Sequence, residues 1–166
     1  MKKVLMFSCL LFLFAFLVGC DNESIEKENV SNQKIIHEHC TRSGFAGEDN
    51  VVTLYYDIYY QGDVLKRLES YEGIESSDSS LLDQYEKSYR SVHENYNGLD
   101  YYQTSVLRDD THVVSQILID YENIDIERLI EIEGEEDNIF ENKVPKASKW
   151  KELAKKVGAK CSVVEE

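Results

Sequence analysis

The chain has 166 residues, of which 32 are acidic and 18 basic, giving a formal net charge of −14. That length suffices for one domain with a hydrophobic core, even after the export segment described next is removed. The acidic balance argues against nucleic acid and anionic lipid as partners, because binding either depends on Lys and Arg that neutralise phosphates.

Residues 1–19 have the layout of a secretory signal. One Met and two Lys precede an apolar run over residues 4–18, which at about fifteen residues is shorter than the roughly 20 that a membrane-spanning helix needs. The run ends in LVGC at residues 17–20, which resembles the lipobox of bacterial lipoprotein precursors. The resemblance implies cleavage before Cys20 and diacylglycerol on its sulfur, which would anchor the protein stably. An ordinary signal peptide followed by a chance cysteine is the alternative.

Residues 20–33 follow as a polar, charged stretch without hydrophobic periodicity, and we expect a flexible acidic tether there. Folded patterning starts with a β-branched segment at residues 34–40, before a turn or loop rich in Gly, Ser and Asp that reaches residue 50. Residues 52–60 alternate clearly between a face with Val, Leu, Ile and Tyr and a face with Thr, Asp and Tyr, which predicts a strand. A Gln-Gly-Asp turn then predicts an antiparallel return strand over residues 63–74.

An N-capping Ser or Asp at residues 77–80 precedes apolar residues at three- and four-residue steps up to Tyr96, which predicts a helix that Gly98 ends. A second hairpin is predicted over residues 99–121, around a turn at Asp109 and Asp110. Two further helices are predicted: a short one at residues 124–132, and a last one that follows Pro145 and ends at Gly158.

These elements predict an α+β fold: an antiparallel sheet of about five strands, including two hairpins, with helices packed on one face. No linker interrupts the pattern, so residues 34–166 are expected to form a single domain.

Three cysteines remain after the signal, and lipid is expected on Cys20. Cys40 and Cys161 then lie near the two ends of the domain in an oxidising compartment, where a disulfide between them is expected. Two buried free thiols are the alternative.

Several motifs in chain order carry a likeness to a known group. They are CTRSG near the domain start, the Tyr-rich strand with its QGD turn, the amphipathic helix before YNGLDYY, the segment ILIDYENIDIERL and the closing LAKKVGAKC. This order resembles the YehR-like family of small bacterial lipoproteins, a domain of unknown function. The resemblance covers nearly the whole mature chain. It implies a lipid-anchored α+β domain in which Cys40 can pair with Cys161, and it implies no enzyme activity.

Motifs typical of metal-binding or catalytic sites are scarce in the sequence. His37 and His39 are two apart on a predicted strand and face the same way, and Cys40 would complete a crude metal-binding set. A closed zinc site needs a fourth ligand, and an oxidised cysteine cannot ligate, so a solvated strand face is the default and no metal or cofactor is expected. The chain lacks Gly-x-Ser-x-Gly, Ser-x-x-Lys and His-Glu-x-x-His motifs, so no catalytic residue is expected.

The 11 tyrosines include three doublets, in each of which one ring must face away from the core if the segment is a strand. Exposed Tyr suits recognition of a peptide, glycan or protein, although Tyr is also a favoured strand residue. We therefore expect a non-enzymatic lipoprotein on the extracytoplasmic face of the cell membrane, acting as a binding or accessory module for an unknown envelope protein or small ligand. The alternative is a lipoprotein that captures a metal cation or small cationic solute through His37, His39 and nearby acids.

Overall fold

The computed structural model describes residues 33–45, 50–134 and 138–165. The predicted signal peptide, Cys20 and the predicted tether up to residue 32 lie outside this part. No helix among the described residues is both long enough and apolar enough to cross a membrane.

The described chain consists of eight strands and three helices. In chain order they are β1 (Ile35–Phe45), β2 (Val51–Gln61), β3 (Val64–Glu75), α2 (Ser79–Glu94), β4 (Tyr102–Arg108), β5 (His112–Asp120), α3 (Ile126–Glu133), β6 (Phe140–Glu141), β7 (Val144–Pro145), α4 (Ala147–Lys156) and β8 (Lys160–Val163).

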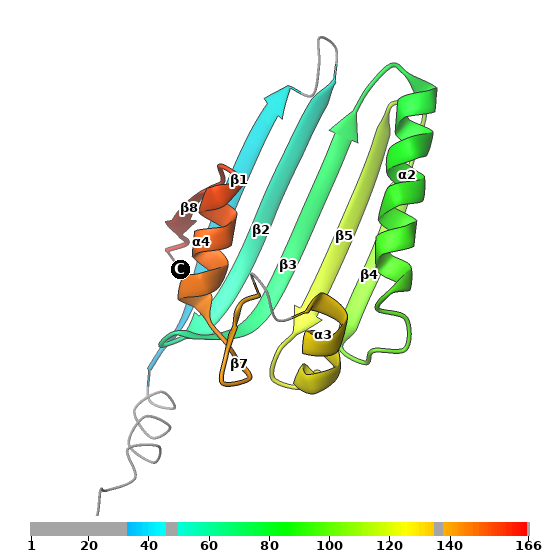
Figure 1. The fold of residues 1–166 in the computed structure, drawn as a ribbon. Helices are drawn as coiled ribbons and strands as arrows, with labels where there is room; N and C mark the ends of the chain where they lie inside the picture. Colours follow the sequence, from blue (N-terminus) through cyan, green and yellow to red (C-terminus); the bar gives the residue numbers. More distant parts are fainter. Residues whose placement is uncertain (1–32, 46–49, 135–137, 166) are drawn as a thin grey trace, which may run out of the picture.

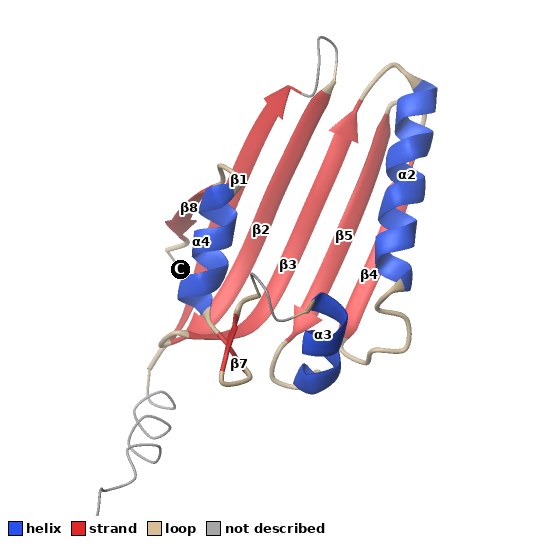
Figure 2. Ribbon diagram, in the orientation of Figure 1, coloured by secondary structure: helices blue, strands red, loops and turns tan. Residues whose placement is uncertain are grey.

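Six strands form one antiparallel sheet in the order β4-β5-β3-β2-β1-β8. The two predicted hairpins are β2–β3 and β4–β5, and pairing of β3 with β5 joins them. Figures 1 and 2 show the sheet with α2, α3 and α4 on the same side of it. The predicted α+β class, with helices on one face of an antiparallel sheet, is therefore confirmed.

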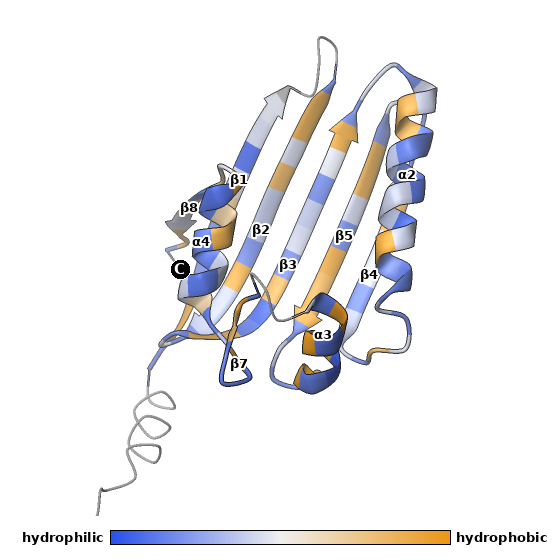
Figure 3. Ribbon diagram, viewed as in Figure 1, coloured by the Kyte–Doolittle hydropathy of each residue, from blue (hydrophilic) through white to orange (hydrophobic). Residues whose placement is uncertain are grey.

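Alternating side chains build the core between the sheet and the helices, and apolar and polar bands alternate along β2, β3 and β5 (Figure 3). The larger cluster packs Ile58 and Leu68 of the sheet beneath α3 and α4, with Leu129 and Trp150 from those helices. A smaller cluster, with Leu82 at its centre, lies beneath α2. The hydrophobic face of every helix thus packs against the same side of the sheet.

Aspartates fix the starts of all three helices. Asp78 accepts hydrogen bonds from two backbone amides in the first turn of α2, and Asp125 accepts one from an amide in the first turn of α3. The cap of α4 comes from a distant turn: Asp63, between β2 and β3, accepts from the amide and the hydroxyl of Ser148 at 2.8 and 2.9 Å. This contact fixes the last helix to the first hairpin.

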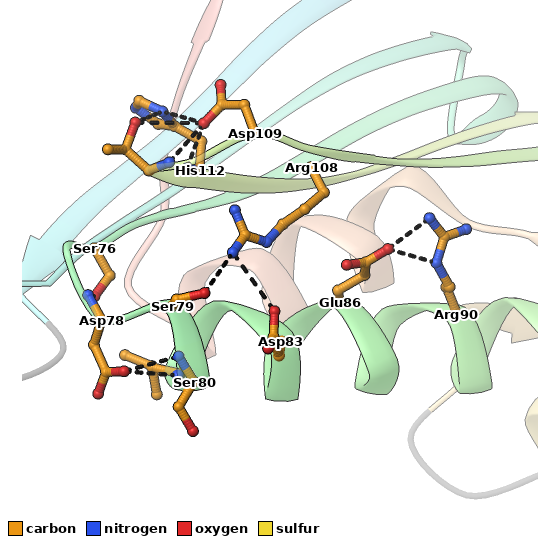
Figure 4. A network of polar contacts seen from close by, with 12 residues as sticks. Ser76, Asp78, Ser79, Ser80, Asp83, Glu86, Arg90, Arg108, Asp109 and His112 are labelled. Atoms are coloured by element: carbon orange, nitrogen blue, oxygen red, sulfur yellow. Dashed lines mark hydrogen bonds and ion pairs between the residues drawn. The ribbon is translucent and has the colours of Figure 1, made fainter.

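Helix α2 is also tied to the edge of the sheet by an arginine. Nη2 of Arg108, at the end of β4, donates to the hydroxyl of Ser79 at 3.4 Å and lies 3.5 Å from a carboxylate oxygen of Asp83 (Figure 4). Both partners belong to the first turns of α2. The edge strand and the helix that covers it are therefore joined by polar contacts as well as by apolar packing.

Two strand boundaries differ from the sequence prediction. The loop expected after Cys40 is instead strand as far as Phe45, because residues 41–45 continue the pairing of β1 with the long strand β2. The end of the chain, predicted without a strand, forms β8, which pairs with β1 at the sheet edge. Both segments are strands because they form hydrogen bonds with a neighbouring strand. The local sequence pattern does not show which strand lies beside them.

Candidate functional site

One face of the six-stranded sheet carries no helix. All three helices pack on the side that holds Ile58, Leu68 and Ile119, and none packs on the other side within the described residues (Figure 1). We call that other side the open face. Strand register places on it His37, His39, Tyr55, Asp57, Tyr59, Arg67, Glu69, Tyr71, Gln103, Ser105, Gln116 and Leu118.

Two histidines of β1 converge on one carboxylate of β2. Asp57 lies opposite His39 in the register and diagonal to His37. Nε2 of His37 is 2.7 Å, and Nδ1 of His39 2.9 Å, from the same Oδ1 atom of Asp57. Partial burial raises the pKa of Asp57, but the hydrogen bonds from both imidazoles outweigh burial and hold the pKa below its ordinary value. The carboxylate is therefore charged at neutral pH.

Rings stack across the strands on either side of this cluster. His37 stacks on Tyr59 with ring centroids 4.4 Å apart, and Tyr55 stacks on Tyr71 at the same separation. His39 lies against Tyr55 at 5.8 Å. The expectation that each Tyr doublet of β2 turns one ring away from the core is confirmed, because Tyr55 and Tyr59 lie on the open face. Stacking restricts the rings, so this part of the face is ordered before any partner arrives.

A hollow of about 310 Å³ lies beside these rings, over β3, β5 and β4. Its lining comprises Tyr55, Glu69, Ser70, Tyr71, Gln103, Thr104, Ser105, Gln116, Ile117 and Leu118. Glu69 is paired with Arg67 at 2.7 Å, and the hydroxyl of Ser105 donates to the amide oxygen of Gln116 at 3.0 Å. The hollow thus offers hydroxyl and amide groups, together with one carboxylate whose charge is balanced.

The predicted disulfide is present. Cys40 of β1 and Cys161 of β8 face each other in the register and are bonded, at a sequence separation of 121. A carboxylate oxygen of Glu38 lies within 4.8 Å of both sulfurs. Since both sulfurs are oxidised, this group of three is not a metal centre. Cys40 also faces the helices, so the His37, His39 and Cys40 set considered from the sequence does not assemble.

A buried polar group lies under α4, next to the disulfide. The hydroxyl of Tyr60 donates to Glu38 at 2.5 Å, and Nζ of Lys151 donates to the same carboxylate at 3.1 Å. Burial lowers the pKa of Lys151, but its contacts with Glu38 and Tyr60 outweigh burial and raise it. One oxygen of the buried acid thus accepts from both partners, and this arrangement reads as structural support for α4.

A second hollow, of about 260 Å³, lies on the helix side between the sheet and helices α3 and α4. Tyr102, Tyr121 and Trp150 are among its mostly apolar lining, and Glu133 at the end of α3 is its one charged residue. Glu133 is exposed as a residue, but desolvation of its carboxyl beside this hollow raises the pKa of that group to about 7. This acid therefore titrates near neutral pH.

Sequence reasoning singled out His37 and His39 but missed Asp57. The sequence feature that could have indicated Asp57 is its place as an acid on the polar side of a Tyr-rich strand. What brings it to the histidines is the register between β1 and β2, and a single sequence does not give that register.

No protein-family model and no curated protein matches the chain. Among solved structures, the NMR structure of the E. coli YehR protein matches with a TM-score of 0.55 and 18% identity, over 81% of this chain and 96% of that one. An NMR structure of a protein from Streptococcus pneumoniae TIGR4 covers 97% and 96%, with a TM-score of 0.47 and 14% identity. The likeness to YehR inferred from sequence motifs is therefore confirmed at the level of the fold.

Proposed function

We propose that this chain is a lipoprotein held on the extracytoplasmic face of the cell membrane by lipid on Cys20, and that its domain is a non-enzymatic binding module. The LVGC motif after a short apolar run supports the anchor. Replacement of Cys20 by Ser is expected to leave an uncleaved or soluble product. Fractionation of cells and labelling with palmitate measure both properties. Membrane-bound protein of mature size in the Cys20→Ser variant would contradict the anchor.

The open face carries the binding proposal. Its aromatic rings are already restricted by stacking on one another. Binding of a partner to these rings therefore costs little side-chain entropy. Burial and nearby acids raise the pKa of the Tyr55 and Tyr59 hydroxyls, which therefore remain protonated donors at neutral pH. We propose that the partner is an envelope protein. Because the chain carries a net charge of −14, a neutral or basic surface fits it best.

Photo-cross-linking in intact cells tests this proposal. An aromatic cross-linking residue at position 71 should yield an adduct of reproducible size, and one at position 84, exposed on α2, should not. The Tyr55→Ala substitution should abolish the adduct formed from position 71. Equal adducts from both positions, or an adduct indifferent to Tyr55→Ala, would contradict binding at the open face.

Capture of a small cation is the second candidate function. One observation favours it: both imidazoles lie within hydrogen-bond distance of a single carboxylate oxygen on the same solvent-facing side of the sheet. Thermal unfolding with added cations is the first test, since a ligand at 100 times its dissociation constant stabilises the fold by about 2.7 kcal/mol. No shift with any divalent cation would remove this candidate.

A further inference from the structure

His37, His39 and Asp57 supply a three-ligand set of a kind that metals use. Two nitrogens come from alternate residues of one strand and one oxygen from the adjacent antiparallel strand. Because His37 and His39 are separated by one residue, both rings project on the same side of the sheet. Three protein ligands that leave a position open to water are characteristic of accessible zinc sites.

We propose that His37, His39 and Asp57 bind one divalent transition-metal ion of the zinc class, which rests on the second candidate function above. Nε2 of His37, Nδ1 of His39 and Oδ1 of Asp57 are the ligand atoms, because the two nitrogens lie 2.7 and 2.9 Å from that one oxygen, although they are more than 4.8 Å from each other. The ion takes the place of the two N–H hydrogen bonds. Each neutral imidazole then carries its proton on the other ring nitrogen.

The donor set selects the class of metal. Imidazole nitrogen suits zinc, copper and nickel ions, whereas calcium and magnesium take oxygen ligands. The anionic Asp57 attracts the cation. The set contains no thiolate, which is the ligand that soft metal ions prefer. The two cysteines of the described chain are oxidised and lie on the helix side of the sheet.

The surroundings hold the ligands and leave them accessible. His37 is stacked on Tyr59 and His39 lies against Tyr55, so both rings are restricted. The side chains of His37, His39 and Asp57 are 23%, 39% and 21% exposed, which allows an ion to enter from solvent. Closing on an ion requires the two nitrogens to move toward each other, to within about 2.0–2.1 Å of the metal. This movement requires each ring to shift against the tyrosine that it contacts.

Isothermal titration of the full chain in detergent, purified without a polyhistidine tag, tests the proposal. Zinc chloride should bind with one ion per chain, and calcium chloride should give no heat. Asp57→Asn and His37→Gln should each weaken zinc binding at least about 100-fold, since losing even a supporting residue costs 10–100-fold. His112→Ala is the matched control, because it removes a histidine that also contacts an aspartate but lies at the Asp109 turn (Figure 4).

Cobalt substitution identifies the ligands independently. The bound cobalt ion should show visible absorption without the near-ultraviolet charge-transfer band that a cysteine ligand would produce. Circular dichroism of each variant verifies that it is folded. The metal site would be overturned if titration with zinc chloride produced no heat of binding. It would also be overturned if the Asp57→Asn and His37→Gln variants were both folded and bound zinc with unchanged affinity. Cross-linking from position 71 that persists in that case would leave the partner-binding function standing.

Discussion

Glycine 73 determines how one ring of the open face lies. A Cβ atom at this position would sit 3.0 Å from Cε1 and 3.2 Å from the hydroxyl oxygen of Tyr71, so the ring rests over the bare backbone. We expect Gly73→Ala to displace Tyr71 from its stack on Tyr55 and to lower the free energy of unfolding by about 1 kcal/mol through crowding. Urea denaturation and near-ultraviolet circular dichroism measure these changes.

Gly44 provides the control, because nothing lies within 4 Å of a Cβ placed there in β1. Gly44→Ala should be neutral or stabilising by about 0.4–1 kcal/mol, since alanine restricts the unfolded chain. Equal effects of the two substitutions would contradict the role assigned to Gly73.

Glu133 is expected to make stability depend on pH. Desolvation of its carboxyl raises its pKa to about 7 in the fold, so between its ordinary pKa and about 7 the folded chain holds a proton that the unfolded chain has released. Stability from this residue is therefore greatest at acid pH and falls as the pH rises through that window. Glu133→Gln should raise the melting temperature at pH 8 and change it little at pH 4. Glu152→Gln on α4, at a position that does not line this hollow, is the control, and an identical pH profile for both variants would contradict the assignment.

At the scale of elements, the cap of α4 links two parts of the fold that are far apart in the chain. The carboxylate of Asp63 accepts two hydrogen bonds from Ser148, and its backbone oxygen accepts one from the amide of Ala147. Asp63→Ala removes the side-chain bonds and should cost about 1 kcal/mol of stability. Asp110→Ala in the other hairpin turn is the matched control in urea denaturation. A loss as large in that variant would show that the α4 cap is not the cause.

Which elements the sequence reveals depends on where their stabilising contacts lie. Strand β2 and helix α2 were predictable because their own residues carry a period and, for α2, a capping group at Asp78. Strand β8 was not, because its four residues are all exposed and their order comes from pairing with β1. The candidate site divides in the same way: His37 and His39 share a strand, whereas Asp57 joins them only through the register of two strands.

For the whole molecule, the Cys40–Cys161 bond joins the first strand to the last across nearly the entire domain. Closing a loop of 121 positions restricts the unfolded chain, which the chain-entropy model values at about 5 kcal/mol as an upper limit. We expect Cys40→Ala combined with Cys161→Ala to lower the free energy of unfolding by about 2–5 kcal/mol.

Hydrogen exchange separates this global effect from a local one. Strand β8 pairs with β1 alone and has exposed side chains, so its amides should lose protection first when the bond is removed. The amides of β3 and β5, in the middle of the sheet, should lose protection only by the amount of the global destabilisation. Unchanged protection of β8 in the double variant would mean that strand pairing, and not the covalent bond, holds the last strand to the sheet.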